Sequence, residues 1–583
     1  MKKKGLRRIA VYLSRYSGAI LVSVILSAVY VVLTLLLPLI AGDAIDIVDR
    51  YIHDPAYQGK GWENDLRFEL VRFAACFAAA AVVQRIISLV NNSVTYRVLH
   101  DVRRDAFGHL QELDISYIDK HSAGDLVSRI TSDADQFADG ILMALQQLFT
   151  GAATIIGAFI FMMRANVYAA LLVAVLTPVS MFIAKYIASH TYDMSLKQSQ
   201  TRGEQTAFIN EMITDQSVVR AFSHEKAQLE QFDRINDLLT ERSVKAIFYS
   251  SLTNPTARFA NNLIYAVIAL AGAYFCTEAG GAVFTVGMLT AVLSYVTQYT
   301  KPFNEITGVF TELQGSAAAA RRLFEVIDEE PQTPDADGVL GEVEGNIDLN
   351  DVSFSYDKSR KLLENVELHV KRGQRIAVVG PTGCGKTTLI NLLMRFYDTD
   401  AGSITVDGTD IRDVTRDSLR DNIGMVLQDT WLRSGTIRDN IIMGKPDASD
   451  EEVIAAAKAT HAHSFIKRLP NTYDTVIGED GGSLSQGQKQ LLCITRVMLS
   501  PPPILILDEA TSSIDTRTEI LINRAFNKLM QGRTSFIVAH RLSTIMNADV
   551  ILVMRDGNII EQGNHAELLR QNGFYAKLYH SQI

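Results

Sequence analysis

Residues 380–387 read GPTGCGKT, a glycine-rich segment between an apolar stretch at 375–379 and a helix-favouring stretch at 388–394. Glycines let backbone N–H groups approach phosphate oxygens, and the N-terminus of the following helix adds partial positive charge. The lysine can neutralise the terminal phosphates of a nucleotide, and the threonine after it can coordinate Mg²⁺. The pattern predicts a phosphate-binding loop with these contacts: Gly380, Thr382, Gly383, Cys384, Gly385, Lys386, Thr387 and Thr388.

Two carboxylates close a second apolar stretch. Residues 504–507 read ILIL and are followed directly by Asp508 and Glu509. A carboxylate at the end of a buried strand suits Mg²⁺, directly or through water, so we assign Asp508 and Thr387 as metal ligands. Glu509 is then placed to polarise an attacking water as general base. The pair predicts that the bound ATP is hydrolysed.

A third motif lies between these two. Residues 484–488 read LSQGQ and precede a predicted helix at 489–499. Serine and glycine at a helix start form another phosphate cradle, to which we assign Ser485, Gly487 and Gln488. One loop cannot cover both sides of the same terminal phosphate, so the second cradle indicates ATP held between two domains. His540, after an apolar stretch at 535–539, is a further candidate for contact with that phosphate.

The elements that position these motifs divide the chain into two parts. Residues 345–583 have the composition of a soluble α/β domain, whereas residues 17–300 are dominated by long apolar windows and are assigned to a transmembrane domain at 1–327. An acidic segment with two prolines, at 328–344, is predicted to be the linker. The fold class that follows is an α-helical six-span transmembrane domain with long cytoplasmic helix extensions, fused to an α/β P-loop nucleotide-binding domain.

Six membrane spans are predicted. They lie at about 17–41, 68–89, 140–163, 165–184, 259–277 and 279–300. Each can cross a hydrocarbon core of about 30 Å as a helix. The first follows basic residues, as a secretory signal does, but its apolar run is too long for one. Arg85 interrupts the second span. It is either a functional charge in the membrane or a side chain that reaches the inner interface, and we favour the second interpretation.

Lysine and arginine placement sets the orientation. They gather in 1–16, 93–138 and 189–256, whereas the loop after the first span is acidic. The positive-inside rule therefore places the N-terminus, both long segments and the nucleotide-binding domain in the cytoplasm. Neither long segment is rich in glycine, proline or serine, so we expect the membrane helices to continue into the cytoplasm. Each excursion is expected to turn at its tip, near 115–124 and near 215–220.

Composition excludes other classes. The net charge is −9, and no basic block exceeds the cluster at the N-terminus, so nucleic acid is not an expected partner. The four cysteines lie too far apart for a disulfide or metal framework. Cys384 is expected to be a reactive thiolate, because the helix start and Lys386 should lower its pKa.

With these motifs and spans, the whole chain resembles the ABC transporter superfamily, specifically a half-transporter of the exporter type. The resemblance implies that Tyr356 stacks on adenine and that Gln428 binds Mg²⁺ and the attacking water. His540 would be the switch histidine. Ser485 and Gly487 would face the ATP of the partner subunit.

The resemblance also assigns roles between domains. Residues 512–515 would be the D-loop, and Glu479 would sense the membrane helices. The tips near 115–124 and 211–220 look like coupling helices. Gln486 stands where the commonest signature has glycine. The strings at 484–488 and 512–517 look most like one subunit of bacterial heterodimeric exporters, namely the subunit with a complete Walker B glutamate, here Glu509. A homodimer remains an alternative.

The function implied is ATP-driven export of amphipathic small molecules, lipids or peptides across the cytoplasmic membrane. The chain would be one half of a dimer, embedded in the lipid bilayer, with ATP and Mg²⁺ as cofactors. Aromatic and uncharged polar residues in the spans favour an amphipathic cargo. Import of a siderophore-like substrate on the same fold is the alternative. A soluble ABC ATPase acting in translation or DNA repair is disfavoured by the six spans.

Overall fold

In the computed structural model, the backbone is described for residues 2–55, 57, 61–278, 284–358, 361–427, 430–478, 481–482, 484–508, 514–538 and 545–582. The chain forms two compact units. The helical unit comprises Met1–Gln111 and Ala123–Glu329, and the α/β unit comprises Glu112–Ser122 and Glu330–Ile583. The chain therefore passes between the two units at three places.

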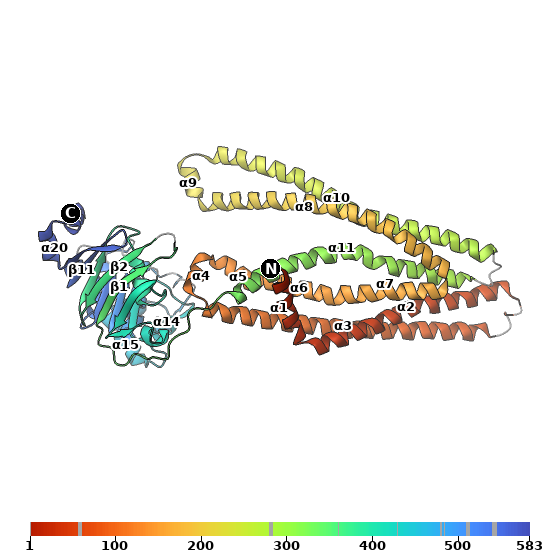
Figure 1. Ribbon diagram of the computed structural model, residues 1–583. Coiled ribbons are helices and arrows are strands. Elements are labelled where there is room, and N and C mark those ends of the chain that lie inside the picture. Colours follow the sequence, from red (N-terminus) through yellow and green to blue (C-terminus); the bar gives the residue numbers. More distant parts are fainter. Residues whose placement is uncertain are drawn as a thin grey trace. The chain divides into compact units, whose positions relative to one another are not determined.

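Long helices that run beside one another make up the helical unit (Figure 1). They are α2 (Ser17–His53), α3 (Trp62–Glu112), α7 (Phe149–Ala165), α8 (Val167–Thr214), α10 (Glu225–Glu278) and α11 (Val286–Asp328). Shorter segments are α1 (Lys2–Ser14), α5 (Ala123–Ser128), η1 (Arg129–Asp133), α6 (Ala134–Met143), η2 (Ala144–Leu148) and α9 (Gln216–Ala221). The segments η1 and η2 are π-helical. Helix α8 packs along α10, and α11 packs against α2, α6 and α7.

Three of these helices are much longer than a membrane is thick. Helices α3, α8 and α10 contain 51, 48 and 54 residues, which corresponds to about 70–80 Å against a hydrocarbon core of about 30 Å. The short helices α4 (Ile115–Lys120) and α9 lie at the two turns expected from the sequence. The membrane helices thus have the long extensions that the polar, helix-favouring segments indicated.

Among the described residues, three helical segments are long and apolar enough to cross a membrane: Ser17–His53, Trp62–Glu112 and Ala123–Ala165. The predicted spans 165–184, 259–277 and 279–300 each include residues whose side chains the structure leaves undescribed, so the six-span count stays a prediction. Helix α11 begins at Val286, later than the predicted 279. Thr285 Oγ1 caps it by accepting a hydrogen bond from the N–H of Met288 at 3.1 Å.

Two sheets and a short ribbon form the β part of the α/β unit (Figure 1). The central sheet has the order β12–β11–β3–β10–β9–β6, with every neighbouring pair parallel except β11 and β12. Its strands are β3 (Arg375–Val379), β6 (Ile423–Val426), β9 (Ile504–Asp508), β10 (Thr534–Val538), β11 (Val550–Arg555) and β12 (Asn558–Gly563). The antiparallel sheet, in the order β2–β1–β4–β5, contains β1 (Ile347–Phe354), β2 (Leu363–Val370), β4 (Ala401–Val406) and β5 (Thr409–Asp410). The ribbon pairs β7 (Gly435–Thr436) with β8 (Val476–Ile477).

Helices pack on both faces of the central sheet. They are α12 (Lys386–Leu393), α13 (Arg416–Asp421), α14 (Ile437–Ile442), α15 (Asp450–Ala459), α16 (His463–Ile466), η3 (Thr472–Asp474), α17 (Gln486–Leu499), α18 (Thr516–Leu529), α20 (His565–Gln571) and α21 (Phe574–Gln582). The parallel strands read as continuous apolar runs because both of their faces are buried.

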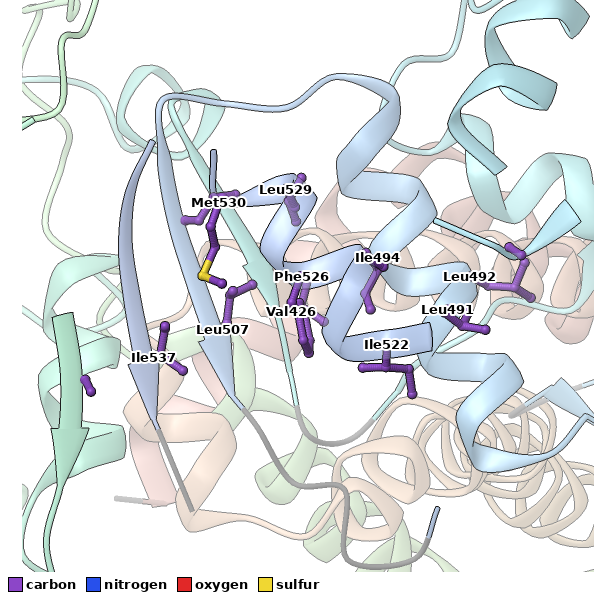
Figure 2. Packing of buried hydrophobic residues seen from close by; sticks show 14 of the residues in the cluster. Val426, Leu491, Leu492, Ile494, Leu507, Ile522, Phe526, Leu529, Met530 and Ile537 are labelled. Atoms are coloured by element: carbon purple, nitrogen blue, oxygen red, sulfur yellow. The ribbon is translucent and has the colours of Figure 1, made fainter. Parts of the chain in front are cut away.

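Successive side chains of each central strand enter different cores. Leu507 of β9 belongs to one cluster with α17 and α18, whereas its neighbour Ile506 belongs to a second cluster with α12 and the antiparallel sheet. Figure 2 shows the first cluster, in which Phe526 of α18 packs with Val426 and Leu507 of the sheet. Burying each such side chain contributes about 1.5–3 kcal/mol to stability. The two cores therefore hold the carboxyl ends of the parallel strands in fixed positions.

Residues 112–122 belong to the α/β unit, although Ala123–Glu329 of the helical unit separates them in sequence from the rest of it. Leu113 forms a β-bridge with Pro331, and the carbonyl of Glu112 accepts a hydrogen bond from the N–H of Gln332 at 2.8 Å. Asp119 of α4 accepts a hydrogen bond from the Tyr397 hydroxyl. The sequence prediction assigns all residues up to 327 to the transmembrane domain. In the structure, α4 lies before that boundary but packs with the α/β unit.

The predicted linker is also held on the α/β unit. Asp335 accepts hydrogen bonds from the backbone N–H of Arg416 at 3.0 Å and from its guanidinium at 2.5 Å. Burial acts to raise the pKa of Asp335, but the contacts with Arg416 outweigh it and hold that pKa below its usual value. The charged contact fixes the path by which the chain enters the unit.

Candidate functional site

The glycine-rich segment joins β3 to α12, as the sequence predicted, although α12 starts at Lys386. A Cβ at Gly380 would lie 2.2 Å from the carbonyl oxygen of Met554 and 2.7 Å from Cys384 Sγ, so no side chain fits there. Gly385 precedes α12 with φ of 101°, in the left-handed region that favours glycine. These two glycines give the loop its tight turn.

Lys386 points into the loop. Its Nζ donates to the carbonyl oxygens of Gly380 at 2.8 Å and Pro381 at 3.0 Å, and lies 3.9 Å from Cys384 Sγ. The residue is only 9% exposed. The carbonyl contacts compensate the cost of burying the ammonium group. The loop therefore surrounds a positive charge that phosphate oxygens can approach.

A pocket of about 350 Å³ opens beside this loop. It is lined by Leu362, Thr382, Gly383, Gly385, Lys386, Thr387, Thr388, Asp508 and Val538. Most of the predicted loop residues thus meet Asp508 in one pocket. Gly380 and Cys384 are not among the lining residues, and Cys384 is only 3% exposed. The expectation of a readily reactive thiolate at Cys384 therefore does not fit its burial.

The donors in the pocket fit Mg²⁺. The Thr387 hydroxyl and the Asp508 carboxylate supply oxygen, which is the ligand atom that this ion prefers. In the part of the chain that the structure describes, no cluster of three or more His, Cys, Asp or Glu residues could hold a metal ion. An ion held here would take its other ligands from nucleotide phosphates and water, as is usual for Mg²⁺.

Strand register brings the ends of four strands to the same sheet edge. Val538 pairs with Val378 on one side and with Asp508 on the other, and Leu507 pairs with Val426. Three predicted catalytic residues follow these strands in the chain, but they lie outside the described residues: Glu509, His540 and Gln428. Glu479 and residues 512–513 also lie outside them. Their assigned roles stay predictions.

Tyr356 lies two residues beyond the end of β1. The rings of Phe354 and Tyr397 stand nearly perpendicular to it, with centroids 4.9 and 5.0 Å away. Asn391 Nδ2 donates to the Tyr356 hydroxyl at 3.2 Å. Tyr356 stays 46% exposed and does not line the phosphate pocket. The arrangement fixes an accessible ring on which a flat ligand can stack.

Ser485 and Gln488 cap the start of α17 together. Ser485 Oγ accepts from the N–H of Gln488 at 3.3 Å, and Gln488 Oε1 accepts from the N–H of Ser485 at 3.0 Å. This capping box starts α17 at Gln486, three residues before the predicted position. Gln488 therefore has a structural partner in this conformation, and its assigned contact with phosphate stays a prediction.

Gly487 is required for packing. A Cβ at this position would lie 2.4 Å from Thr518 Cγ2 and 3.1 Å from Ile514 Cγ2. Thr518 belongs to α18, whose N-cap, Asp515, accepts from the Thr518 N–H at 3.0 Å. That backbone hydrogen bond lowers the pKa of Asp515. The close approach of α17 and α18 thus depends on the absence of a side chain at Gly487.

Two contacts near the site were not expected from the sequence. Gln486, the departure from the commonest signature, donates through Nε2 to Thr430 Oγ1 at 3.2 Å. Tyr397 supports Tyr356 and donates to Asp119 of α4, and burial together with this hydrogen bond raises the Tyr397 pKa above its usual value. Neither Thr430 nor Tyr397 lies in a motif, and the two residues of each pair are far apart in sequence. The only sequence feature that pointed to either contact was the glutamine at position 486, where the commonest signature has glycine.

The fold and the pocket define a P-loop ATPase joined to membrane helices. Family profiles agree with both parts. Residues 20–303 match the ABC transporter transmembrane region, and residues 363–512 match the ABC transporter profile of the ATP-binding domain. The chain belongs to the ABC transporter family and is an exporter-type half-transporter, with one membrane region and one ATPase domain.

Relatives match along most of the chain. An uncharacterized ABC transporter ATP-binding protein of Bacillus subtilis, YfiC, is 38% identical over 100% of this chain and 94% of its own length. A fatty acid ABC transporter ATP-binding/permease protein of Mycobacterium bovis is 39% identical over 86% of this chain and 79% of its own. A putative multidrug export ATP-binding/permease protein of Bacillus subtilis, YgaD, is 34% identical over 98% of both chains.

Among solved structures, a bacterial Atm1-family ABC exporter with ATP bound has a TM-score of 0.76 and 29% identity, over 98% of this chain and 99% of its own. The resemblance to exporter half-transporters is thereby confirmed over the whole chain. The protein is a multi-pass membrane ATPase that couples ATP hydrolysis to transport, and a half-transporter works as a dimer.

Proposed function

We propose that this half-transporter exports amphipathic molecules across the cytoplasmic membrane, with two ATP molecules bound between the nucleotide domains of a dimer. The observation that carries the proposal is the pocket in which the phosphate loop meets Asp508. The names of the fatty acid transporter and of the multidrug exporter among the relatives support an amphipathic cargo. Small molecules, lipids and peptides of this kind are the candidate substrates.

ATP would bind to the phosphate loop in the conformation that the structure shows. Phosphate oxygens would replace the carbonyl partners of Lys386, while the N–H groups at the start of α12 donate to the same phosphates. Thr387, Asp508 and Gln428 would hold Mg²⁺, which neutralises phosphate charge when bound. Tyr356 would stack on the adenine ring.

The second half of the site would come from the partner. Ser485 and Gly487 of one subunit would face the terminal phosphate bound by the other, so two ATP molecules would close the nucleotide domains. Glu509 would take a proton from the attacking water, and His540 would orient the terminal phosphate. Closure would pass to the membrane helices through α4 and α9, and hydrolysis would reset the pair.

We further propose that the partner is a different half-transporter, one that lacks the Walker B glutamate. The basis is the likeness of the strings at 484–488 and 512–517 to the complete subunit of asymmetric pairs. A homodimer is the alternative, because no motif of this chain is missing.

The test of the ATPase assignment is Glu509→Gln in the purified, active dimer. We expect the variant to bind ATP, to hydrolyse it about 10²–10⁴-fold more slowly, and to accumulate as a closed dimer, because binding does not need the general base. Nucleotide binding and phosphate release are measured together, with the exposed Glu451→Gln on α15 as control. Hydrolysis at near the native rate in Glu509→Gln would contradict the role given to Glu509.

A further inference from the structure

A second cavity, of about 640 Å³, opens between helices of the helical unit. Its lining comes from α2, α3, η2, α7 and α11, and the side chains fall in or directly beside the predicted spans 17–41, 68–89, 140–163 and 279–300. The volume is within the range of about 300–1,000 Å³ that small-molecule sites occupy. Part of the wall is apolar, with Tyr30, Leu37 and Phe73. The cavity can therefore accept an apolar chain along this part of its wall.

Four glutamine side chains make the rest of the wall unusual for a membrane domain: Gln84, Gln146, Gln147 and Gln298. Within the described part of the chain, none of these amides hydrogen-bonds to another residue. A polar group in the membrane interior costs free energy unless it finds a partner. These amides thus present donors and acceptors to whatever enters the cavity.

The backbone around the cavity is also interrupted. Pro38 of α2 and Pro302 of α11 both line it, and proline has no N–H to donate to the carbonyl four residues earlier. Those carbonyls belong to Thr34 and Gln298, which line the same cavity. Gln146 and Gln147 sit on the π-helix η2, a form that is frequent at functional sites. Three irregular helical positions therefore converge on one cavity.

The described lining of the cavity carries a positive charge and no negative charge. Lys301 of α11 lines the cavity, and no described lining residue is an aspartate or a glutamate. Lys301 also interacts within the chain, but an ammonium group has several N–H donors and can hold more than one partner. An anionic head group would meet this cation and the amide N–H groups. A cationic head group would find no counter-charge among the described lining residues.

We propose that this cavity binds the exported substrate, and that the substrate is an amphiphile with an anionic head group, a carboxylate or a phosphate. Lys301 and the glutamine amides hold the head group, and the apolar tail lies along Tyr30, Leu37 and Phe73. This assignment rests on the proposed export function and narrows its substrate class. Hydrogen bonds to charged groups are stronger than neutral ones, so the charge decides which amphiphiles bind tightly.

The experiment compares amphiphiles that share one tail. The full chain is reconstituted as its active dimer in lipid nanodiscs, and hexadecanoate, hexadecyl phosphate, hexadecanol and hexadecyltrimethylammonium are added in turn. The concentration that half-maximally stimulates ATP hydrolysis is measured for each. A photoreactive hexadecanoate is cross-linked and its attachment mapped by mass spectrometry. We expect the two anions to act at the lowest concentrations and the label to fall on α2, η2 or α11. The stronger anion identifies the head group.

Lys301→Gln is expected to raise the half-maximal concentration of both anions by about tenfold or more, and to leave that of hexadecanol unchanged. Lys301→Arg keeps the charge and should stay within about threefold of the native value. Lys245→Gln, on an exposed face of α10, is the matched control. Thermal unfolding of each variant checks that it folds.

Three results would count against the inference. An equal loss for hexadecanol in Lys301→Gln, a label outside the lining helices, or tighter action of the cation in the native chain would each overturn it. In the last case the export function stands with a different substrate class. If no amphiphile stimulated hydrolysis or was transported, the proposed export function itself would fail.

Discussion

Gly487 shows that a signature residue has a packing role besides its proposed contact with phosphate. Gly487→Ala would bring a Cβ to 2.4 Å from Thr518 Cγ2. Overpacking of this kind costs about 1–3 kcal/mol, so we expect a lower melting temperature and slower ATP hydrolysis. Thermal unfolding and ATPase rate of the purified protein measure both effects.

Gly478→Ala is the matched control, since a Cβ there meets nothing within 4 Å. Unchanged stability in Gly487→Ala would show that α17 and α18 tolerate a side chain at this position, contrary to the packing argument.

Single residues were predictable where a local pattern defines them. The loop 380–387 could be located because glycine, lysine and threonine have separate reasons to occupy fixed positions in a phosphate loop. The orientation of Cys384 was not predictable. Its burial against Gly380 depends on the turn of the loop and on Met554, a residue of a strand far along the chain. A reactive thiol needs exposure, which local charge alone does not provide.

Among the elements, α4 has a defined contact with the α/β unit through Tyr397 and Asp119. Tyr397→Phe removes the hydroxyl and leaves the ring against Tyr356. A hydrogen bond to a charged group contributes about 1.5–3 kcal/mol, so the docking of α4 should weaken while ATP binding persists. We expect substrate transport in proteoliposomes to fall more than ATP hydrolysis does.

Tyr473→Phe is the control for this variant, because its hydroxyl also has a side-chain partner, His463 at 2.8 Å, away from α4. A fall of transport and hydrolysis in the same proportion in Tyr397→Phe would mean that the contact does not couple the two activities.

Apolar patterns in the sequence were enough to predict the type and order of the helices and strands. The exact helix ends were not predicted, because they are set by capping residues. Helices α12 and α17 begin earlier than predicted because Gly385 and Ser485 precede them as caps, while their first residues are polar and give no apolar signal. Helix α11 begins later than the apolar window because Thr285 caps it. Pairings such as Gln486 with Thr430 need the folded chain, since nothing local in the sequence links the two residues.

For the whole molecule, the proposed asymmetric pair leads to a prediction about assembly. Purified alone, the chain should show little substrate-stimulated ATP hydrolysis, and co-expression with a half-transporter lacking the Walker B glutamate should restore it. Mass measurement and ATPase assays on both preparations test this. A stable, fully active homodimer would exclude the asymmetric pair and leave the exporter function in place.

The three passages of the chain between its units have a mechanical consequence. A body attached by one flexible strand swivels freely, whereas one attached at three points turns only if an attachment bends. The first passage, between Gln111 and Glu112, lies at the last residue of the continuous helix α3, which has 51 residues. A tilt of about 5° over its roughly 75 Å length shifts the far end by about 6–7 Å. Helix α3 can therefore act as a lever arm, which converts a small rotation at its Glu112 end into a displacement of about one helical turn at its other end.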